Sequence, residues 1–236
     1  MEKINFKRIG IVVATEREQE PFFEVFGEPT HTISEYGHQI SIWTKENEHT
    51  ICLIRSGYGE IAATMATQYL IDHCHIDMII NYGAVGALRD MISATELGIV
   101  HKIIHYGFDL SGGGKYPKGV YPKIGSPYIE PNDDIFSGVS ELDEYVCASA
   151  DKFVYGGEPK RNLYKEFHAD VCDMESAGIV LTCNQNKIPC GFIKAVSDGV
   201  DEDQEAFEEN VYEASRKCVD VIATFIRIWT LDFFKK

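Results

Sequence analysis

Two carboxylates, Glu175 and Asp198, each follow a short apolar stretch of the chain and could do acid–base chemistry together. The first stretch covers residues 169–173 and the second covers residues 191–197. A carboxyl group can give or take a proton, and a carboxylate stabilises a neighbouring positive charge. If both groups face one cleft, that cleft could break a bond to a leaving group that needs a proton.

The residues between these stretches predict how the carboxylates are positioned. Residues 176–186 place apolar side chains at helical spacing, and Pro189 prevents the helix from continuing. A strand–helix–strand unit of about 30 residues normally makes two parallel strands with a right-handed crossover. Small ligands bind at the carboxyl ends of such strands. We therefore expect two parallel strands, with Glu175 and Asp198 at one edge of the sheet.

A third carboxylate, Glu18, follows the first expected strand, residues 8–15. Thr15 can cap the helix that follows, and Glu18 stands three residues later, which is the spacing of a capping box. Gly27 can end this helix. Glu18 is thus either a structural capping residue or a carboxylate on the ligand edge of the sheet, and its spacing alone leaves both interpretations open.

The middle of the chain predicts a mixed sheet and two glycine turns. Three strands of a meander are expected at residues 31–36, 39–44 and 50–55. A helix with good periodicity is expected from Ile61 to Ile71. One glycine pair precedes this helix, and a second pair, Gly83 and Gly86, follows the expected strand 78–82. The first pair could offer backbone N–H groups to an anion or simply form a tight turn, and its spacing does not match a dinucleotide or triphosphate loop. The second pair could lie on the ligand edge or simply allow close packing of the backbone.

The second half of the chain contains one long irregular segment. Residues 105–134 include three consecutive glycines and four prolines, which predicts a loop that either covers a ligand or buries an interface. Phe153 comes just after an expected strand, 144–150, and could stack on a base or belong to the core. Residues 163–167 predict a short helical turn, and residues 205–234 predict a long amphipathic helix.

Composition excludes several classes of partner. The chain of 236 residues has 22 basic and 37 acidic side chains, a net charge of −15, which argues against binding to nucleic acid or to an anionic membrane. It contains no apolar run of about 18 residues that could span a membrane. Seven cysteines without a C-x-x-C pair predict buried thiols in a cytoplasmic protein, and the eight histidines show no metal-ligand spacing. No composition break divides the chain, so we expect one α/β domain over residues 1–236.

Several motifs together make the chain resemble the purine nucleoside phosphorylase/uridine phosphorylase superfamily, and within it the 5′-methylthioadenosine/S-adenosylhomocysteine nucleosidases. These motifs are IGIVVATEREQE, LIRSGYGEIAAT, IINYGAVGAL, SADKFV, CDMESAGIV and KAVSDGVD. The resemblance covers about residues 8–104 and 144–230. It implies a three-layer α/β/α domain around a central mixed sheet, a homodimer, a purine nucleoside as substrate, and neither a metal nor an organic cofactor.

The resemblance also implies roles for single residues. Glu18 would activate water, Glu175 together with Met174 would hold the ribose, and Asp198 would protonate nitrogen 7 of the purine. Phe153 would stack on the base, and the backbone of Val154 would contact the edge of the purine. The remaining candidates for substrate binding are Tyr58, Gly83, Ala84, Ser197 and Phe207.

The acceptor and the substrate remain partly open. Phosphorylases of this superfamily carry an Arg before the second glycine turn and a Ser or Thr within it, whereas residues 81–86 have neither. This favours hydrolysis of an adenine nucleoside such as 5′-methylthioadenosine or S-adenosylhomocysteine. A phosphate-dependent phosphorylase is the first alternative, and a non-catalytic nucleoside-binding or storage protein is the second.

Four positions depart from the usual pattern of these nucleosidases. Thr15 stands where Met is common, Ala84 replaces a Ser, and Lys194 replaces an Arg. Tyr58 stands where a small aliphatic residue lines the pocket for the 5′-alkylthio group. A tyrosine hydroxyl at that position predicts a more polar or smaller 5′ group.

Overall fold

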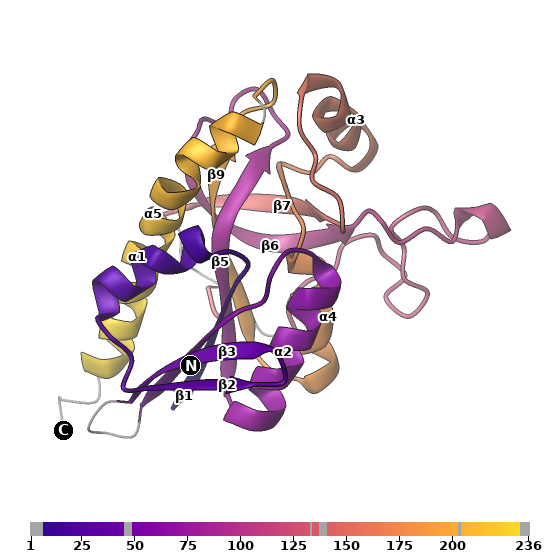
Figure 1. Cartoon of the computed structure of the whole chain (residues 1–236). Helices are drawn as coiled ribbons and strands as arrows, with labels where there is room; N and C mark the ends of the chain where they lie inside the picture. The colour runs from indigo at the N-terminus through magenta and orange to yellow at the C-terminus, as the bar shows by residue number, and fades with distance from the viewer. Residues whose placement is uncertain (1–6, 45–48, 133, 137–140, 203, 232–236) are drawn as a thin grey trace.

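The computed structural model describes residues 7–44, 49–132, 134–136, 141–202 and 204–231 (Figure 1). Its strands are β1 (Arg8–Val13), β2 (His31–Glu35), β3 (His38–Thr44), β4 (Thr50–Arg55), β5 (Met78–Ala87), β6 (Leu97–His105), β7 (Asp143–Ser149), β8 (Val171–Asp173) and β9 (Cys190–Asp198). Its helices are α1 (Glu16–Phe26), α2 (Glu60–Cys74), the short 3₁₀ turn η1 (Ser111–Gly113), α3 (Gly157–Phe167), α4 (Ser176–Asn186) and α5 (Gln204–Leu231).

Helices cover both faces of a mixed sheet. Side chains alternate along its strands, and apolar side chains on both faces have to be buried. On β1, Ile11 and Val13 belong to the apolar cluster that contains Phe22 of α1 and residues of α5. Val12 points the other way and belongs to the cluster under α2 and α4. The fold is therefore the expected α/β architecture, with helices in two layers around a central mixed sheet. The predicted meander is also confirmed, since β3 pairs antiparallel with both β2 and β4.

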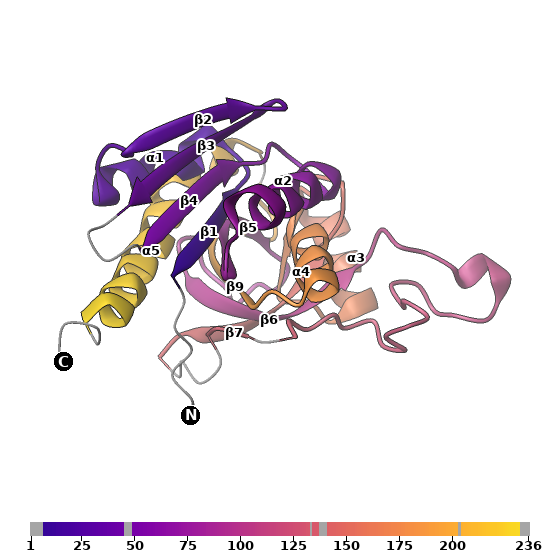
Figure 2. The ribbon, with the colours of Figure 1, turned by 90° about the horizontal axis from the view of Figure 1, so that it is seen from below.

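Five of the strands close into a ring. β5 pairs with β9 along most of its length and with β8 at its end. β9 pairs with β6, β6 with β7, and β7 with β8, which returns to β5. The remaining strands, β2, β3, β4 and β1, extend from β5 as an open sheet (Figure 2).

The ring corrects one prediction. β8 runs antiparallel to β5 whereas β9 runs parallel to it, so the two strands around α4 are neither parallel to each other nor neighbours. The expectation of two parallel strands assumed that both join one open sheet. Instead, β8 closes the ring beside β7. The pairing of β5 with β9 shifts between Val85 and Gly86, and we call this place the bend of β5. Because β8 is only three residues long and meets β5 at Gly86 and Ala87, its carboxyl end still lies near this bend.

Two further expectations about local structure are wrong. The second glycine pair does not form a turn, because β5 continues through Gly83 to Ala87 and carries an irregularity between Val85 and Gly86. The short helical turn expected at residues 163–167 is part of an eleven-residue helix, α3. A turn was expected because glycine usually interrupts a strand, but here glycine is the residue that lets β5 pass another side chain closely.

The long irregular segment extends away from the rest of the fold, with η1 near its tip (Figure 2). α5 is the expected long amphipathic helix. The predicted end of this helix at residue 234 lies outside the described residues. Within the described part of the chain, none of the helices is long and apolar enough to cross a membrane.

Candidate active site

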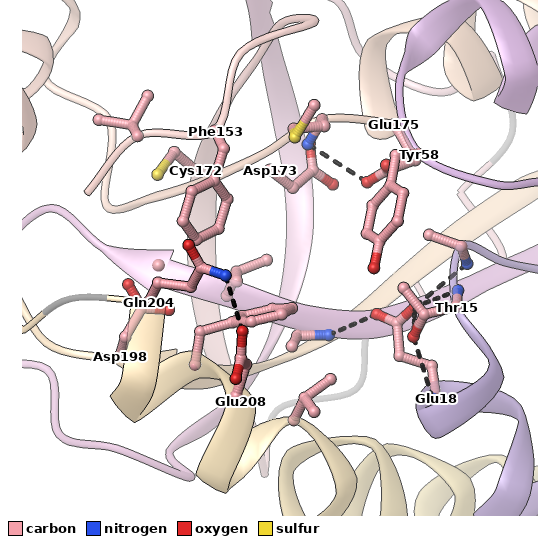
Figure 3. A pocket seen from close by; sticks show the side chains of 18 of the residues that line it. Thr15, Glu18, Tyr58, Phe153, Cys172, Asp173, Glu175, Asp198, Gln204 and Glu208 are labelled. Carbon is pink, nitrogen blue, oxygen red and sulfur yellow. Dashed lines mark hydrogen bonds between the residues drawn. The ribbon is translucent and has the colours of Figure 1, made fainter.

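One pocket of about 510 Å³ lies where β1, β8 and β9 end, beside the bend of β5 and the start of α5 (Figure 3). Nine of the eleven residues selected from the sequence line it: Glu18, Tyr58, Ala84, Phe153, Val154, Met174, Glu175, Asp198 and Phe207. The other two, Gly83 and Ser197, lie directly behind lining residues. Glu175 and Asp198 thus share a pocket, although the strand geometry that predicted this was wrong.

Glu18 lies in the first turn of α1 and folds back over the end of β1. Its Oε2 accepts hydrogen bonds from the N–H groups of Ala14 (3.2 Å) and Thr15 (2.8 Å) and from Thr15 Oγ1 (3.0 Å). Its Oε1 accepts one from the Ala84 N–H (3.1 Å). Thr15 Oγ1 also accepts a hydrogen bond from the Glu18 N–H, which completes a capping box. Both interpretations of Glu18 therefore hold, since the same carboxylate caps the helix and lines the pocket.

Gly83 allows β5 to approach this carboxylate. Its φ angle is +153°, and a Cβ atom placed there would lie 2.3 Å from Glu18 Oε1. A side chain at this position would displace Glu18 from the Ala84 N–H. The glycine is therefore needed for the close approach of a side chain that lines the pocket, so close packing and a place on the ligand edge, the two interpretations of this pair, hold together.

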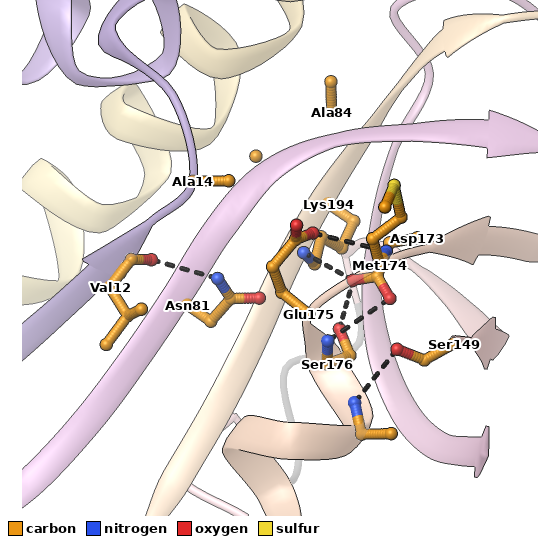
Figure 4. A network of polar contacts seen from close by, with 12 residues as sticks. Val12, Ala14, Asn81, Ala84, Ser149, Asp173, Met174, Glu175, Ser176 and Lys194 are labelled. Carbon is orange, nitrogen blue, oxygen red and sulfur yellow. Dashed lines mark hydrogen bonds and ion pairs between the residues drawn. The ribbon is translucent and has the colours of Figure 1, made fainter. Parts of the chain in front are cut away.

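Glu175 is held at the N-terminus of α4 by one backbone group from a distant segment and one from the preceding residue. Its Oε1 accepts a hydrogen bond from the Gly59 N–H (2.8 Å), and its Oε2 accepts one from the Met174 N–H (3.2 Å). Beside it, Asp173 forms a fully buried ion pair with Lys194, with Nζ 2.9 Å from Oδ2 (Figure 4). The pocket floor therefore contains two carboxylates, with one ammonium group buried behind them.

Charge is divided unequally between these two carboxylates. Burial raises the pKa of Glu175 to about 8, and the negative charge of Asp173 adds to the shift. Burial also acts to raise the pKa of Asp173, but the Lys194 charge and the Ser176 hydroxyl bring that pKa below its usual value. Lys194 thus neutralises Asp173, and Glu175 is the group that exchanges a proton near neutral pH.

Asp198 ends β9 with both carboxylate oxygens occupied. Ser197 Oγ donates a hydrogen bond to Oδ1 (2.6 Å), and the Nζ of Lys160 forms an ion pair with Oδ2. Burial raises the pKa of Asp198, while the charge of Lys160 acts in the opposite direction. Ser197 was selected as a substrate-binding residue, but in the structure it is fully buried and contacts Asp198 and the Val85 carbonyl instead.

Aromatic side chains form one wall of the pocket. Phe153 projects into it and meets Phe207 edge to face, with ring centroids 5.6 Å apart (Figure 3). Val154 is buried next to Phe153. On the opposite wall, Tyr58 is 69% exposed and its hydroxyl points toward the side of Thr15 and Glu18 (Figure 3). A flat heterocycle fits between apolar walls of this kind, whose aromatic faces favour stacking.

Sequence reasoning missed Lys160, the buried partner of Asp198. Its signal was present, because Lys160, Leu163 and Phe167 occupy one face of α3 at positions i, i+3 and i+7. A lysine on the apolar face of a helix has to find a buried acceptor or charge. Gln204 and Glu208, which hydrogen-bond to each other at 2.7 Å on the pocket rim, were also missed.

The pocket has acid–base groups but no metal-binding cluster. Among the described residues, no three His, Cys, Asp or Glu side chains come together in a way that could hold a metal ion. The carboxylates of the pocket can transfer protons and stabilise a positive charge.

Comparison with known proteins gives consistent matches. The family model described as phosphorylase superfamily matches residues 8–227, which include every residue that lines the pocket. The aminodeoxyfutalosine nucleosidase of Helicobacter pylori is 27% identical over 223 residues, which cover 89% of this chain and 95% of that protein. The 5′-methylthioadenosine/S-adenosylhomocysteine nucleosidase of Buchnera aphidicola is 32% identical over 177 residues, covering 71% and 75%. A crystal structure of the Helicobacter pylori 5′-methylthioadenosine/S-adenosyl homocysteine nucleosidase has a similar fold, with a TM-score of 0.86, 24% identity, and coverage of 93% and 97%.

Proposed function

Because the chain belongs to the phosphorylase superfamily and is similar to its nucleosidases, we propose that it hydrolyses the N-glycosidic bond of a 5′-substituted adenine nucleoside. The products are free adenine and a ribose derivative. The main support is that three carboxylates, Glu18, Glu175 and Asp198, meet in one pocket and have three different environments.

Each environment suits one part of this reaction. The bond to the base breaks through a cation-like ribosyl centre while negative charge develops on the purine. Asp198, beside the aromatic wall, would deliver a proton to nitrogen 7. General acid catalysis of this kind raises the rate by ~10²–10⁴-fold. Glu175 lies at the centre of the pocket floor, where its negative charge stabilises the ribosyl cation. Glu18 takes the proton of the attacking water.

The observation that favours water over phosphate is the position of Glu18. Its carboxylate occupies the N–H groups of Ala14, Thr15 and Ala84, which end β1 and line the bend of β5. A phosphate anion bound at those N–H groups would have to displace this carboxylate or lie against it, at a cost from like-charge repulsion. A water molecule has no such cost and can donate a hydrogen bond to Glu18.

The 5′ substituent is the finer part of the proposal. The two relatives described above are nucleosidases named for different substrates. Besides apolar groups, the pocket is lined by the Tyr58 hydroxyl, two cations and two carboxylates: Arg17, Lys152, Glu16 and Glu208. A hydroxyl and charged side chains of both signs favour a 5′ group with polar or charged atoms over a plain methylthio group. We therefore propose S-adenosylhomocysteine or aminodeoxyfutalosine ahead of 5′-methylthioadenosine.

The test is base release from a panel of nucleosides, measured by chromatography with and without phosphate. The panel contains 5′-methylthioadenosine, S-adenosylhomocysteine, aminodeoxyfutalosine, adenosine and inosine. Adenine released in phosphate-free buffer is the expected result, and the ratio of kcat/KM values identifies the 5′ group. Release only with phosphate would refute hydrolysis, and no release from any member would favour a binding protein.

A further inference from the structure

The buried lysine on α3 has no part in the mechanism above, yet it contacts the acid. We propose that Lys160 is a positioning residue that supplies, through Asp198, the proton taken up by the purine when the glycosidic bond breaks. This inference rests on the proposed function, since it concerns the same reaction at the same pocket.

Lys160 is built into the wall behind Asp198. It is fully buried, and it does not line the pocket. Its ammonium group donates to Asp198 Oδ2, to the Gly199 carbonyl at 2.5 Å and to the Asp198 carbonyl at 3.5 Å. Its Cε lies 3.4 Å from the position that a Cβ on Gly86 would occupy, so its stem packs under β5. Three donors with three acceptors make this a well-satisfied buried charge, as burial requires.

Counting donors around Asp198 shows where the available proton lies. Lys160 donates to Oδ2, while Ser197 Oγ lies 2.6 Å from Oδ1 and 3.2 Å from the Val85 carbonyl, so the single hydroxyl proton of Ser197 has two possible acceptors. An ammonium group has no lone pair to accept a hydrogen bond, so a carboxyl proton on Oδ2 would point at a donor. The ion pair therefore fits an ionised Asp198, and the ammonium group of Lys160 is the cationic donor that can pass a proton to the purine through this carboxylate.

The other charged or titratable groups near this pair do not compete for the role. From β8, Cys172 lies close to both, but burial raises the pKa of its thiol to about 12, so it stays neutral. In the loop after β9, Asp201 forms a bidentate pair with Arg161, and Glu202 accepts a hydrogen bond from the Gly199 N–H at 2.6 Å. Lys160 and Asp198 are therefore each other's charged partner.

The proton movements balance over one turnover. A proton passes from Lys160 Nζ to the Asp198 carboxylate and from that carboxyl to nitrogen 7, while the electron pair of the C1′–N9 bond stays with the purine. Water adds to C1′, and Glu18 takes the proton that this water loses. Solvent then removes the proton from Glu18 and returns one to Lys160, so no other reactant is needed.

The experiment compares three lysine variants over a range of pH. Lys160→Met removes the proton, and Lys160→Arg keeps a positive charge that does not dissociate in this range. Lys165→Met is the matched control, because Lys165 is exposed on the same helix. The readout is kcat/KM for adenine release from the best nucleoside of the panel, divided at each pH by the wild-type value. This division cancels titrations that all variants share, such as that of Glu175.

We expect this ratio to stay constant for Lys165→Met. For Lys160→Met and Lys160→Arg it should fall with rising pH by about tenfold per unit once Asp198 must take its proton from solvent. A second substrate, the p-nitrophenyl glycoside of the same ribose derivative, should lose little activity in both variants, because its leaving group needs no proton. This separates the effect from misfolding.

Three outcomes would overturn the inference. A pH-independent ratio for both Lys160 variants would leave Lys160 with a structural role only. Wild-type behaviour of Lys160→Arg would show that the charge alone is sufficient. An equal loss on both substrates would point to a damaged pocket. If the wild-type protein releases no adenine from any nucleoside, the proposed function itself fails, which is a separate result.

Discussion

The pocket has two sides that are built in different ways, and we name them the water side and the base side after the roles proposed for Glu18 and Asp198. The water side consists of Ala14, Thr15, Glu18 and Ala84, where backbone N–H groups and one hydroxyl hold the carboxylate. The base side contains Asp198, which is held by the buried side chain of Lys160 from a helix 38 positions earlier in the chain. One side depends mainly on contacts within a few residues, and the other depends on a long-range ion pair.

Because of this difference, Glu18 and Asp198 should respond differently to pH and to substitution of their partners. Backbone N–H groups cannot lose their dipoles, so the water side offers a fixed field to whatever occupies it. The ion pair of the base side can gain or lose a proton and can be broken by one substitution. The predictions below start from the largest expected effect.

The first prediction concerns the water side, where Glu18→Gln should lower kcat by about 10²–10⁴-fold, because an amide cannot take a proton from water. Gln at this position preserves the capping-box pattern, so the fold should be unaffected. Adenine release under saturating substrate measures the loss, and circular dichroism checks the helix.

Glu20→Gln provides the matched control, since Glu20 is exposed on the same helix. It should leave kcat unchanged. If Glu18→Gln kept more than about a tenth of the wild-type rate, Glu18 would be a capping residue only and the base would have to be another group.

The second prediction concerns the floor of the pocket, where Lys194→Met should lower the free energy of unfolding by about 3–5 kcal/mol, because it leaves the buried Asp173 without a counter-charge. Urea denaturation measures this. Lys102→Met is the control, since Lys102 forms an exposed pair with Glu130 at 3.9 Å and should cost only about 0–1 kcal/mol. Equal effects of the two changes would mean that Asp173 is protonated when buried.

The third prediction is a pH dependence set by Glu175. Its pKa of about 8 means that kcat/KM, which reports the free enzyme, should rise about tenfold per pH unit below that value and then level off. If kcat/KM instead rose and levelled off near pH 5, Glu175 would not be the group whose ionisation controls the rate. In Glu175→Gln the expected rise should be absent and the plateau rate lower.

The same group makes a signed contribution to stability. Its pKa is raised on folding from about 4.5 to about 8, so its contribution is fully present below pH 4.5 and is lost as the pH rises toward 8. Stability measured against pH should therefore decline more in the wild type than in Glu175→Gln over this interval. A parallel decline would place the buried proton on another group.

The two sides also differ in how far the sequence could predict them. The capping box of Glu18 depends on residues three positions apart, so spacing alone identified it. The ion pair of Asp198 depends on how α3 packs behind β9, and the only sequence signal was a lysine in line with Leu163 and Phe167. Most helices and strands could be predicted from the spacing of apolar residues along the chain. The direction of β8 did not, because a three-residue strand in a closed ring is placed by its neighbours.

The smallest expected effect lies on the rim between the two sides, at Tyr58. It is 69% exposed, so its replacement should not disturb the core, and its hydroxyl faces the water side of the pocket. Tyr58→Ile removes a polar group and adds aliphatic surface. A few methyl groups in such a site change discrimination by about 1–3 kcal/mol, so kcat/KM for 5′-methylthioadenosine should rise by about tenfold relative to S-adenosylhomocysteine. Tyr36→Ile, at a tyrosine that is 83% exposed outside the pocket, should leave the ratio unchanged. An unchanged ratio in Tyr58→Ile would mean that the 5′ group lies away from Tyr58 and that other groups of the pocket rim determine the preference between the two substrates.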